Sequence, residues 1–163
     1  SAQDIARFGQ HGVIASQQPM HVALGDANQA VPSGPWPDAI GPERASRAWA
    51  WKSILQAGGR VAFGSDWPVA PLEPGQGIWL ASTRVKADNA ADQRLSIDDA
   101  LAGYTRWAAY ASFDEQRKGT LEPGKLADIV VLTSDITAAP IPTKSSVVVA
   151  TTVFDGKVVF ERK

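Results

Sequence analysis

The stretch "RVAFGSDWPV" at residues 60–69 sets a short apolar run against an abrupt Gly-Ser-Asp-Trp-Pro sequence. The run "RVAF" predicts a buried strand, and the residues after it predict a loop that carries an acid, Asp66. In α/β folds, loops at the carboxyl ends of the strands converge on one face and carry catalytic or ligand-binding groups. Asp66 is therefore a candidate site residue. The alternative, on spacing alone, is an aspartate that only forms a turn.

A second strand and a helix come before this stretch. "VIASQQP" at 13–19 is a β-prone run closed by Pro19, and "PERASRAWAWKSILQAGG" at 42–59 predicts one helix that begins near Pro42 and stops at Gly58. The usual right-handed crossover makes the two strands parallel, so the loops that follow them lie at the same end of the sheet. We therefore expect His21 and Asp66 to face one site.

Helical patterns also occur at residues 1–12, 75–85 and 96–112, and the last of these opens with a capping box formed by Ser96 and Asp99. After residue 112 the pattern changes. "ADIVVL" at 127–132 predicts a buried strand, and "SVVVATTVFDGKVVFERK" at 146–163 predicts a hairpin with Asp155-Gly156 as its two-residue turn. We place a domain boundary here, between residues 1–112 and 113–163.

Composition limits the classes of function. The 163 residues are 44% hydrophobic, enough to fill a core, and 16 Lys and Arg offset 17 Asp and Glu without any basic run. This balance argues against nucleic acid or an anionic membrane as a partner. No apolar run approaches the roughly 20 residues of a membrane span, and the absence of cysteine excludes disulfides and thiolate chemistry. The compartment stays open, with the cytoplasm weakly favoured.

Several motifs, taken in order, resemble one family. "GTLEPGKLADIVVL" at 119–132, followed by "TTVFDGKVVF" at 151–160, resembles the closing signature of metal-dependent amidohydrolases. "SQQPMHV" at 16–22, the segment 47–69 and "DDALAGYTRWAAY" at 98–110 are similar to the branch that includes N-substituted formamide deformylases. The resemblance implies an α/β fold in which residues 1–112 form the C-terminal part of a (β/α)8 TIM-type barrel. Residues 113–163 would then be strands of a small β-sandwich domain.

The resemblance also implies roles for individual residues. Asp66 matches the acid that ends the eighth barrel strand, which ligates or borders a catalytic divalent metal, typically Zn²⁺ with one or two ions in the complete enzyme. There it accepts a proton from the water that the metal activates. His21 matches the histidine of the family's Gln-Pro-x-His segment and would face the substrate or polarise its carbonyl, the alternative being a loop histidine that caps a turn.

Tryptophans near these residues suggest a substrate pocket. Trp67 follows Asp66 directly, and together with Trp36 and Trp79 it could form the wall of an apolar pocket. The alternative is that these side chains belong to the core, which is where tryptophans in folded chains are usually found. Trp67 is our candidate for substrate binding.

The sequence also departs from the family. It has only two histidines, and the family's His-x-His and its histidines from the fifth and sixth strands have no counterpart. We therefore expect this chain to be the C-terminal portion of a longer hydrolase that cleaves an amide or other non-peptide C–N bond of a small molecule. Its expected partners are that amide-like substrate, the N-terminal part of the barrel and further copies of itself. The alternative is a catalytically silent folding or interaction module that lacks most metal ligands.

Overall fold

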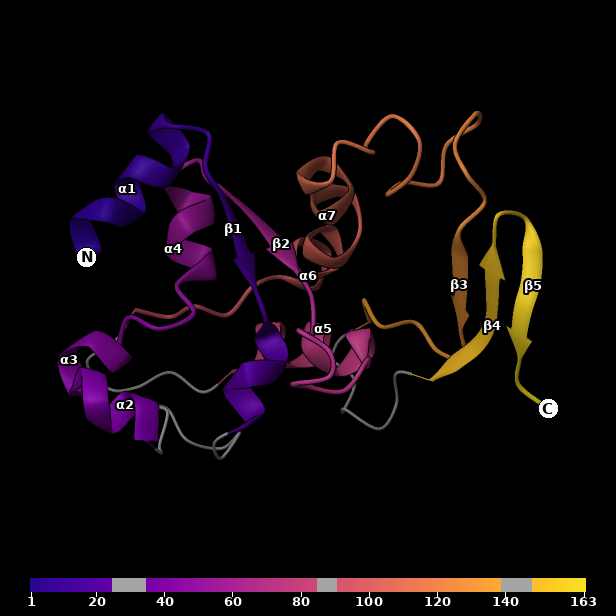
Figure 1. Ribbon diagram of the computed structural model, residues 1–163. Helices are drawn as coiled ribbons and strands as arrows, with labels where there is room; N and C mark the ends of the chain where they lie inside the picture. Colours follow the sequence, from indigo (N-terminus) through magenta and orange to yellow (C-terminus); the bar gives the residue numbers. More distant parts are fainter. Residues whose placement is uncertain (25–34, 85–90, 139–147) are drawn as a thin grey trace.

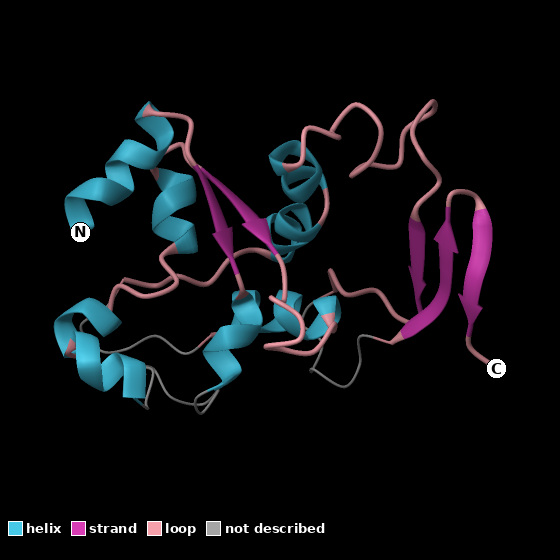
Figure 2. Cartoon of the chain, in the orientation of Figure 1, coloured by secondary structure: helices cyan, strands magenta, loops and turns pink. Residues whose placement is uncertain are grey.

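The computed structural model describes residues 1–24, 35–84, 91–138 and 148–163, and its elements form a mixed α/β structure (Figure 1). β1 (Ile14–Gln17) and β2 (Arg60–Phe63) pair in parallel, in register from Ile14 opposite Arg60 to Gln17 opposite Phe63. Their arrowheads point the same way in Figure 2. The predicted parallel pair is confirmed, so the loops after both strands leave from the same end.

Helices pack on both sides of this pair. α1 (Ala2–Gln10) and α4 (Trp51–Gln56) lie together on one side, and α6 (Ile97–Tyr104) and α7 (Arg106–Ala111) lie beside β2 on the other (Figure 1). The Phe63 ring lies between the two groups, with its centroid 5.8 Å from that of Trp51 and 5.5 Å from that of Tyr104. The core therefore fixes the last residue of β2.

Short elements follow the carboxyl ends of the strands. The 3-10 helix η1 (Pro19–Leu24) comes directly after β1, and α5 (Pro74–Thr83) comes after the loop that leaves β2. η1 and α5 pack against each other through a buried apolar cluster of Met20, Ala70 and Leu80. α2 (Pro35–Ile40) and α3 (Pro42–Ala45) lie before α4. None of the described helices is long and apolar enough to cross a membrane.

The prediction of one helix over 42–59 is wrong. Pro42 does occupy the first turn of α3, but the helix stops at Ala45 and α4 starts only at Trp51, with Trp49 in the left-handed region at φ 53°. The guanidinium of Arg84 donates to the carbonyl oxygens of Ala48 and Trp49 at 3.0 and 3.2 Å. These bonds satisfy carbonyls in the interruption, so a tertiary contact overrides the helical pattern.

Arg84 is held tightly in this position. Its guanidinium carbon lies 5.4 Å from the ring centroid of Trp49 and 5.6 Å from that of Trp51, within cation–π range. Burial lowers the pKa of Arg84 from its ordinary value. The residue links the end of α5 to the start of α4.

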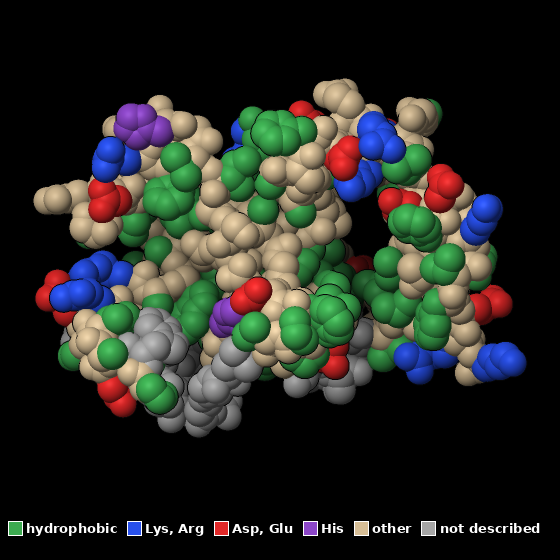
Figure 3. Space-filling view, viewed as in Figure 1, with side chains coloured by type: hydrophobic (Ala, Val, Ile, Leu, Met, Phe, Trp, Pro, Cys, Tyr) green, Lys and Arg blue, Asp and Glu red, His purple; other side chains and the backbone are tan. Residues whose placement is uncertain are grey.

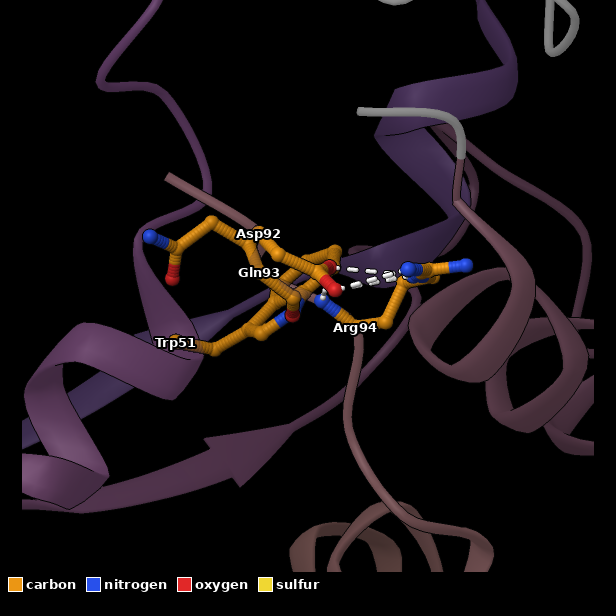
Figure 4. A network of polar contacts seen from close by, with 4 residues as sticks. All are labelled: Trp51, Asp92, Gln93 and Arg94. Carbon is orange, nitrogen blue, oxygen red and sulfur yellow. Dashed lines mark hydrogen bonds and ion pairs between the residues drawn. The ribbon is translucent and has the colours of Figure 1, made fainter. Parts of the chain in front are cut away.

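Gln93, which Figure 4 shows beside Trp51, provides the cap that α4 lacks. The N-cap residue Ala50 has no side-chain acceptor, whereas Gln93 Oε1 accepts from the Ser53 backbone N–H at 3.0 Å and its Nε2 donates to Ser53 Oγ at 2.6 Å. The indole N–H of Trp51 donates to the backbone carbonyl of Gln93. A buried side chain 40 residues away in sequence therefore fixes the first turn of α4.

The helix predicted over 96–112 begins as expected but is interrupted. Ser96 Oγ accepts from the Asp99 N–H at 3.0 Å, which confirms the N-cap. At Thr105 the backbone leaves the helical region, and Thr105 Oγ1 donates to the Leu101 carbonyl at 2.7 Å. The chain returns to this turn at Gly119, where a Cβ would lie 2.7 Å from the Ala109 Cβ. That close backbone approach accompanies the break between α6 and α7.

The chain ends in an antiparallel sheet of β3 (Ile129–Leu132), β4 (Val149–Phe154) and β5 (Lys157–Glu161). Asp155 and Gly156 have φ angles of 49° and 74°, so the predicted two-residue turn is confirmed. The prediction that "ADIVVL" is a buried strand is wrong in its burial. Val130 and Val131 are half exposed, because no second sheet lies against β3 in the described part of the chain (Figure 1). The division into domains 1–112 and 113–163 stays a prediction.

We predict that Gly156→Val lowers the free energy of unfolding by about 1–3 kcal/mol, because a β-branched residue resists a positive φ. A Cβ at this position would meet nothing within 4 Å, so the cost comes from the backbone and not from a clash. Gly156→Asn, which tolerates the left-handed region, is the matched control and should cost much less. Chemical denaturation of both variants checks this prediction. Equal stability of Gly156→Val and Gly156→Asn would mean that the positive φ at Gly156 is not what the turn requires.

We predict that Gln93→Leu destabilises the chain by about 1–3 kcal/mol, because it leaves the partly buried N–H of Ser53 without an acceptor. The control is Asp92→Asn beside it, which weakens the ion pair with Arg94 but keeps an oxygen that can accept from the Arg94 backbone N–H, and it should cost less than about 1 kcal/mol. Melting curves measure both. Similar losses for the two variants would mean that Gln93 does not act as the cap.

Candidate active site

The structure brings His21 and Asp66 together at the carboxyl ends of the parallel strands. His21 Nε2 lies 3.9 Å from Asp66 Oδ2, although His21 comes from η1 and Asp66 from the loop after β2. The Gly64 N–H donates to the Gln17 carbonyl at 3.2 Å, so the hydrogen bonding between the two strands continues one residue past the end of β2. The shared register of β1 and β2 thus sets the separation of the two side chains.

His21 is held inside η1 with its reactive nitrogen covered. Its backbone N–H donates to the Gln18 carbonyl at 3.0 Å, and its side chain is only 22% exposed. Among the described residues, the buried Nε2 has no hydrogen-bond partner. A buried polar atom without a partner is costly, so this nitrogen is suited to a ligand or substrate atom.

Asp66 sits on a tight turn. Its φ of 58° is left-handed, a conformation that aspartate tolerates better than most residues, and the Val69 N–H donates to its carbonyl at 2.7 Å. The side chain is 58% exposed, so the carboxylate is accessible at the edge of the sheet. The backbone is thus fixed by the turn while the carboxylate stays available.

The three tryptophans of the proposed pocket do not share one environment. Trp67 is 65% exposed beside Asp66, as a substrate-contacting side chain would be, whereas Trp79 packs against the cluster of Met20, Ala70 and Leu80. Trp79 therefore belongs to the packing, and the side chain of Trp36 lies outside the described part of the structure. The substrate-binding roles of His21 and Trp67 stay predictions.

Asp66 is the residue of this site that suits a metal ligand. The described residues contain no group of three or more His, Cys, Asp or Glu that could hold a metal ion. Asp66 offers an accessible carboxylate, and His21 Nε2 beside it is a nitrogen without a partner in the described structure. A carboxylate oxygen is a ligand that divalent metals such as zinc accept, so Asp66 fits one ligand position of such a site. Nε2 of His21 lies beside that carboxylate and is available to a substrate atom.

A hollow lies away from this edge. A cavity of about 340 Å³ is lined by Asp4, Arg7, Phe8, His11 and Val13. These residues come from α1 and from the segment before β1 starts, whereas Asp66 follows the carboxyl end of β2. His11 therefore belongs to a different part of the molecule from His21.

Sequence reasoning missed two exposed apolar residues near Asp66. Val69 and Leu72 extend into solvent from the loop that follows it. The segment "WPVAPL" has a signal that could have found them, because it places apolar side chains between prolines without any charge. Gln93 had no such signal, since its partner Ser53 is remote in sequence.

A family model described as "Amidohydrolase family" matches residues 1–160. The chain belongs to the amidohydrolase family. This confirms the resemblance inferred from the motifs.

Individual relatives agree with the assignment. The chain is 40% identical over 134 residues to Protein LONG AFTER FAR-RED 3 of Arabidopsis thaliana, a match that spans 79% of this chain and 22% of that protein. It is 32% identical over 114 residues to the N-substituted formamide deformylase of Arthrobacter pascens, spanning 68% of this chain and 21% of that enzyme. This amidohydrolase chain thus spans about a fifth of the length of these relatives.

A solved structure resembles it as well. The crystal structure of an uncharacterized metal-dependent hydrolase from Pyrococcus furiosus aligns with a TM-score of 0.58 and 26% identity. The alignment covers 76% of this amidohydrolase chain and 24% of that protein.

Proposed function

We propose that this chain forms part of a metal-dependent hydrolase that cleaves an amide or other non-peptide C–N bond of a small molecule. The observation that carries the proposal is the approach of His21 Nε2 to Asp66 Oδ2, 3.9 Å apart at the carboxyl ends of two parallel strands. Family membership and a metal-dependent hydrolase among the structural neighbours support it. The deformylase relative, named for N-substituted formamides, suggests the bond type.

The finer architecture belongs to the same proposal. We assign β1 and β2, with the helices around them, to the C-terminal part of a (β/α)8 barrel, and β3–β5 to a small β-sandwich. The parallel pairing supports the first assignment, because active-site loops of such barrels lie at the carboxyl ends of the strands, where Asp66 is found. The half-exposed valines of β3 support the second, because Val130 and Val131 point to opposite faces of the sheet and each face therefore carries an apolar side chain that a second sheet could cover.

In this enzyme Asp66 would hold the metal and act as the proton acceptor. When bound, the divalent metal, which we propose is Zn²⁺, makes a water molecule more acidic and polarises the scissile carbonyl. Asp66 accepts the proton of the attacking water at a carboxylate oxygen while the new C–O bond forms. It then returns the proton to the amine nitrogen as the C–N bond breaks. Its fixed turn and accessible carboxylate suit this exchange.

His21 would face the carbonyl oxygen of the substrate. Its Nε2 is buried and lacks a partner among the described residues, so a donated hydrogen bond to developing negative charge would satisfy it. The burial of His21 also keeps water from competing for that bond. We therefore propose that His21 stabilises the transition state and that Asp66 moves the proton.

The proposed partners follow from the same picture. They are the amide-like substrate, the remaining part of the barrel, which would supply further metal ligands, and other copies of the chain. When produced alone, the chain should self-associate, because the parallel sheet has two strands in the described residues and a sheet of this size leaves backbone groups unpaired along both edges.

We predict that Asp66→Asn, in an active enzyme containing this chain, reduces kcat by at least about 10²-fold with little loss of stability. The substitution keeps the size of the side chain and removes its basicity. The control is Asp98→Asn, an exposed acid in the first turn of α6, which should leave kcat unchanged. A kcat for Asp66→Asn within a few-fold of wild type would reduce Asp66 to a turn residue and favour a catalytically silent module.

The two histidines provide a second matched test. We predict that His21→Leu lowers kcat by at least about tenfold, because it removes the donor to the carbonyl oxygen. His11→Leu should leave kcat unchanged, because His11 lies at the end of α1 among the residues of the separate cavity. Steady-state kinetics decide, and equal effects of the two substitutions would contradict the proposed role of His21.

A further inference from the structure

The loop between Asp66 and α5 carries no charge over residues 67–72, which read Trp-Pro-Val-Ala-Pro-Leu. We call these residues the 67–72 loop. Acids stand at its two ends, Asp66 before it and Glu73 after it. Exposed apolar surface on a protein often marks a binding site, and this uncharged, proline-stiffened segment between two acids is a candidate for one.

Packing determines which side chains this loop displays. Ala70 is buried in the cluster with Met20 and Leu80, and Met20 is the neighbour of His21 in η1. The loop is therefore anchored at its middle. Trp67, Val69 and Leu72 extend outward and are 65%, 58% and 68% exposed. These three large apolar side chains, within six residues, form an exposed patch on a loop that buried Ala70 anchors.

The patch is continuous with the candidate site. Trp67 follows Asp66 directly, and the Val69 N–H donates to the Asp66 carbonyl at 2.7 Å, so the loop and the acid form one turn. In Figure 3 a histidine and an acidic side chain lie side by side on the lower part of the visible face, next to a group of hydrophobic side chains. A molecule that reaches Asp66 would meet this patch.

We propose that the 67–72 loop binds an uncharged, apolar substituent of the substrate next to the scissile C–N bond. This inference rests on the proposed function and names its substrate class. Burying alkyl or aryl groups against Trp67, Val69 and Leu72 removes apolar surface from water on both sides. Asp66 and Glu73, at the ends of the loop, disfavour a carboxylate or phosphate there.

The test uses an active enzyme containing this chain and a series of N-alkylformamides from propyl to hexyl. Two further N-hexyl compounds carry a terminal carboxylate or a terminal ammonium group. We expect kcat/KM to rise about twofold to fourfold per methylene. The uncharged hexyl compound should exceed both charged compounds by at least tenfold. Calorimetric binding to the Asp66→Asn enzyme should show the same order without turnover.

Substitutions of Leu72 test whether the dependence on alkyl length arises at the 67–72 loop. Leu72→Asp and the milder Leu72→Ser should abolish the dependence on alkyl length and raise KM for the hexyl compound. Leu121→Asp is the matched control, because Leu121 is 73% exposed on the loop before β3, and it should change neither quantity. If both Leu72 variants lose thermal stability while Leu121→Asp does not, another part of the protein covers the loop and the proposal is wrong.

The outcomes separate this proposal from the function on which it rests. Turnover without an alkyl preference, or with a preference for either charged compound, overturns the apolar subsite and leaves the hydrolase intact. Binding that favours the hexyl compound without turnover by the wild-type enzyme supports the subsite and overturns the hydrolase. If the enzyme shows neither binding nor turnover of these compounds, both proposals are contradicted.

Discussion

The parallel pairing of β1 with β2 is the constraint on which the rest of this structure depends. Four residue pairs, from Ile14 with Arg60 to Gln17 with Phe63, set the register. A slip by one residue would move the second loop by about 3.3 Å along the sheet and turn its side chains to the opposite face. His21 and Asp66 would then no longer meet.

The register is stabilised by packing around the last residue of β2. Phe63 contacts Trp51 on one side and Tyr104 on the other, and α6 comes so close that a Cβ at Gly103 would lie 2.4 Å from the Phe63 ring. Trp51 is in turn held by the carbonyl of Gln93, whose side chain caps α4. A chain of contacts therefore runs from a buried glutamine to the strand that carries Asp66 on its outgoing loop.

Sequence patterns predicted the features that neighbouring residues determine. The strands, their parallel order, the Ser96 cap and the Asp155-Gly156 turn follow from residue types at fixed spacings, and the approach of His21 to Asp66 follows from the order of the elements. The interruptions at Trp49 and Thr105 do not, because they depend on Arg84 and on the return of the chain at Gly119. The exposure of Val130 depends on what lies against the sheet, which the residues of the strand itself do not encode.

Anomalous diffraction at the zinc edge, from crystals of an enzyme that contains this chain, tests the central claim most directly. Our account predicts a zinc peak about 2.0–2.2 Å from a carboxylate oxygen of Asp66. The imidazole of His21 should remain beside that carboxylate. A fully occupied zinc site from which Asp66 is absent, with its carboxylate turned toward solvent, would contradict the account.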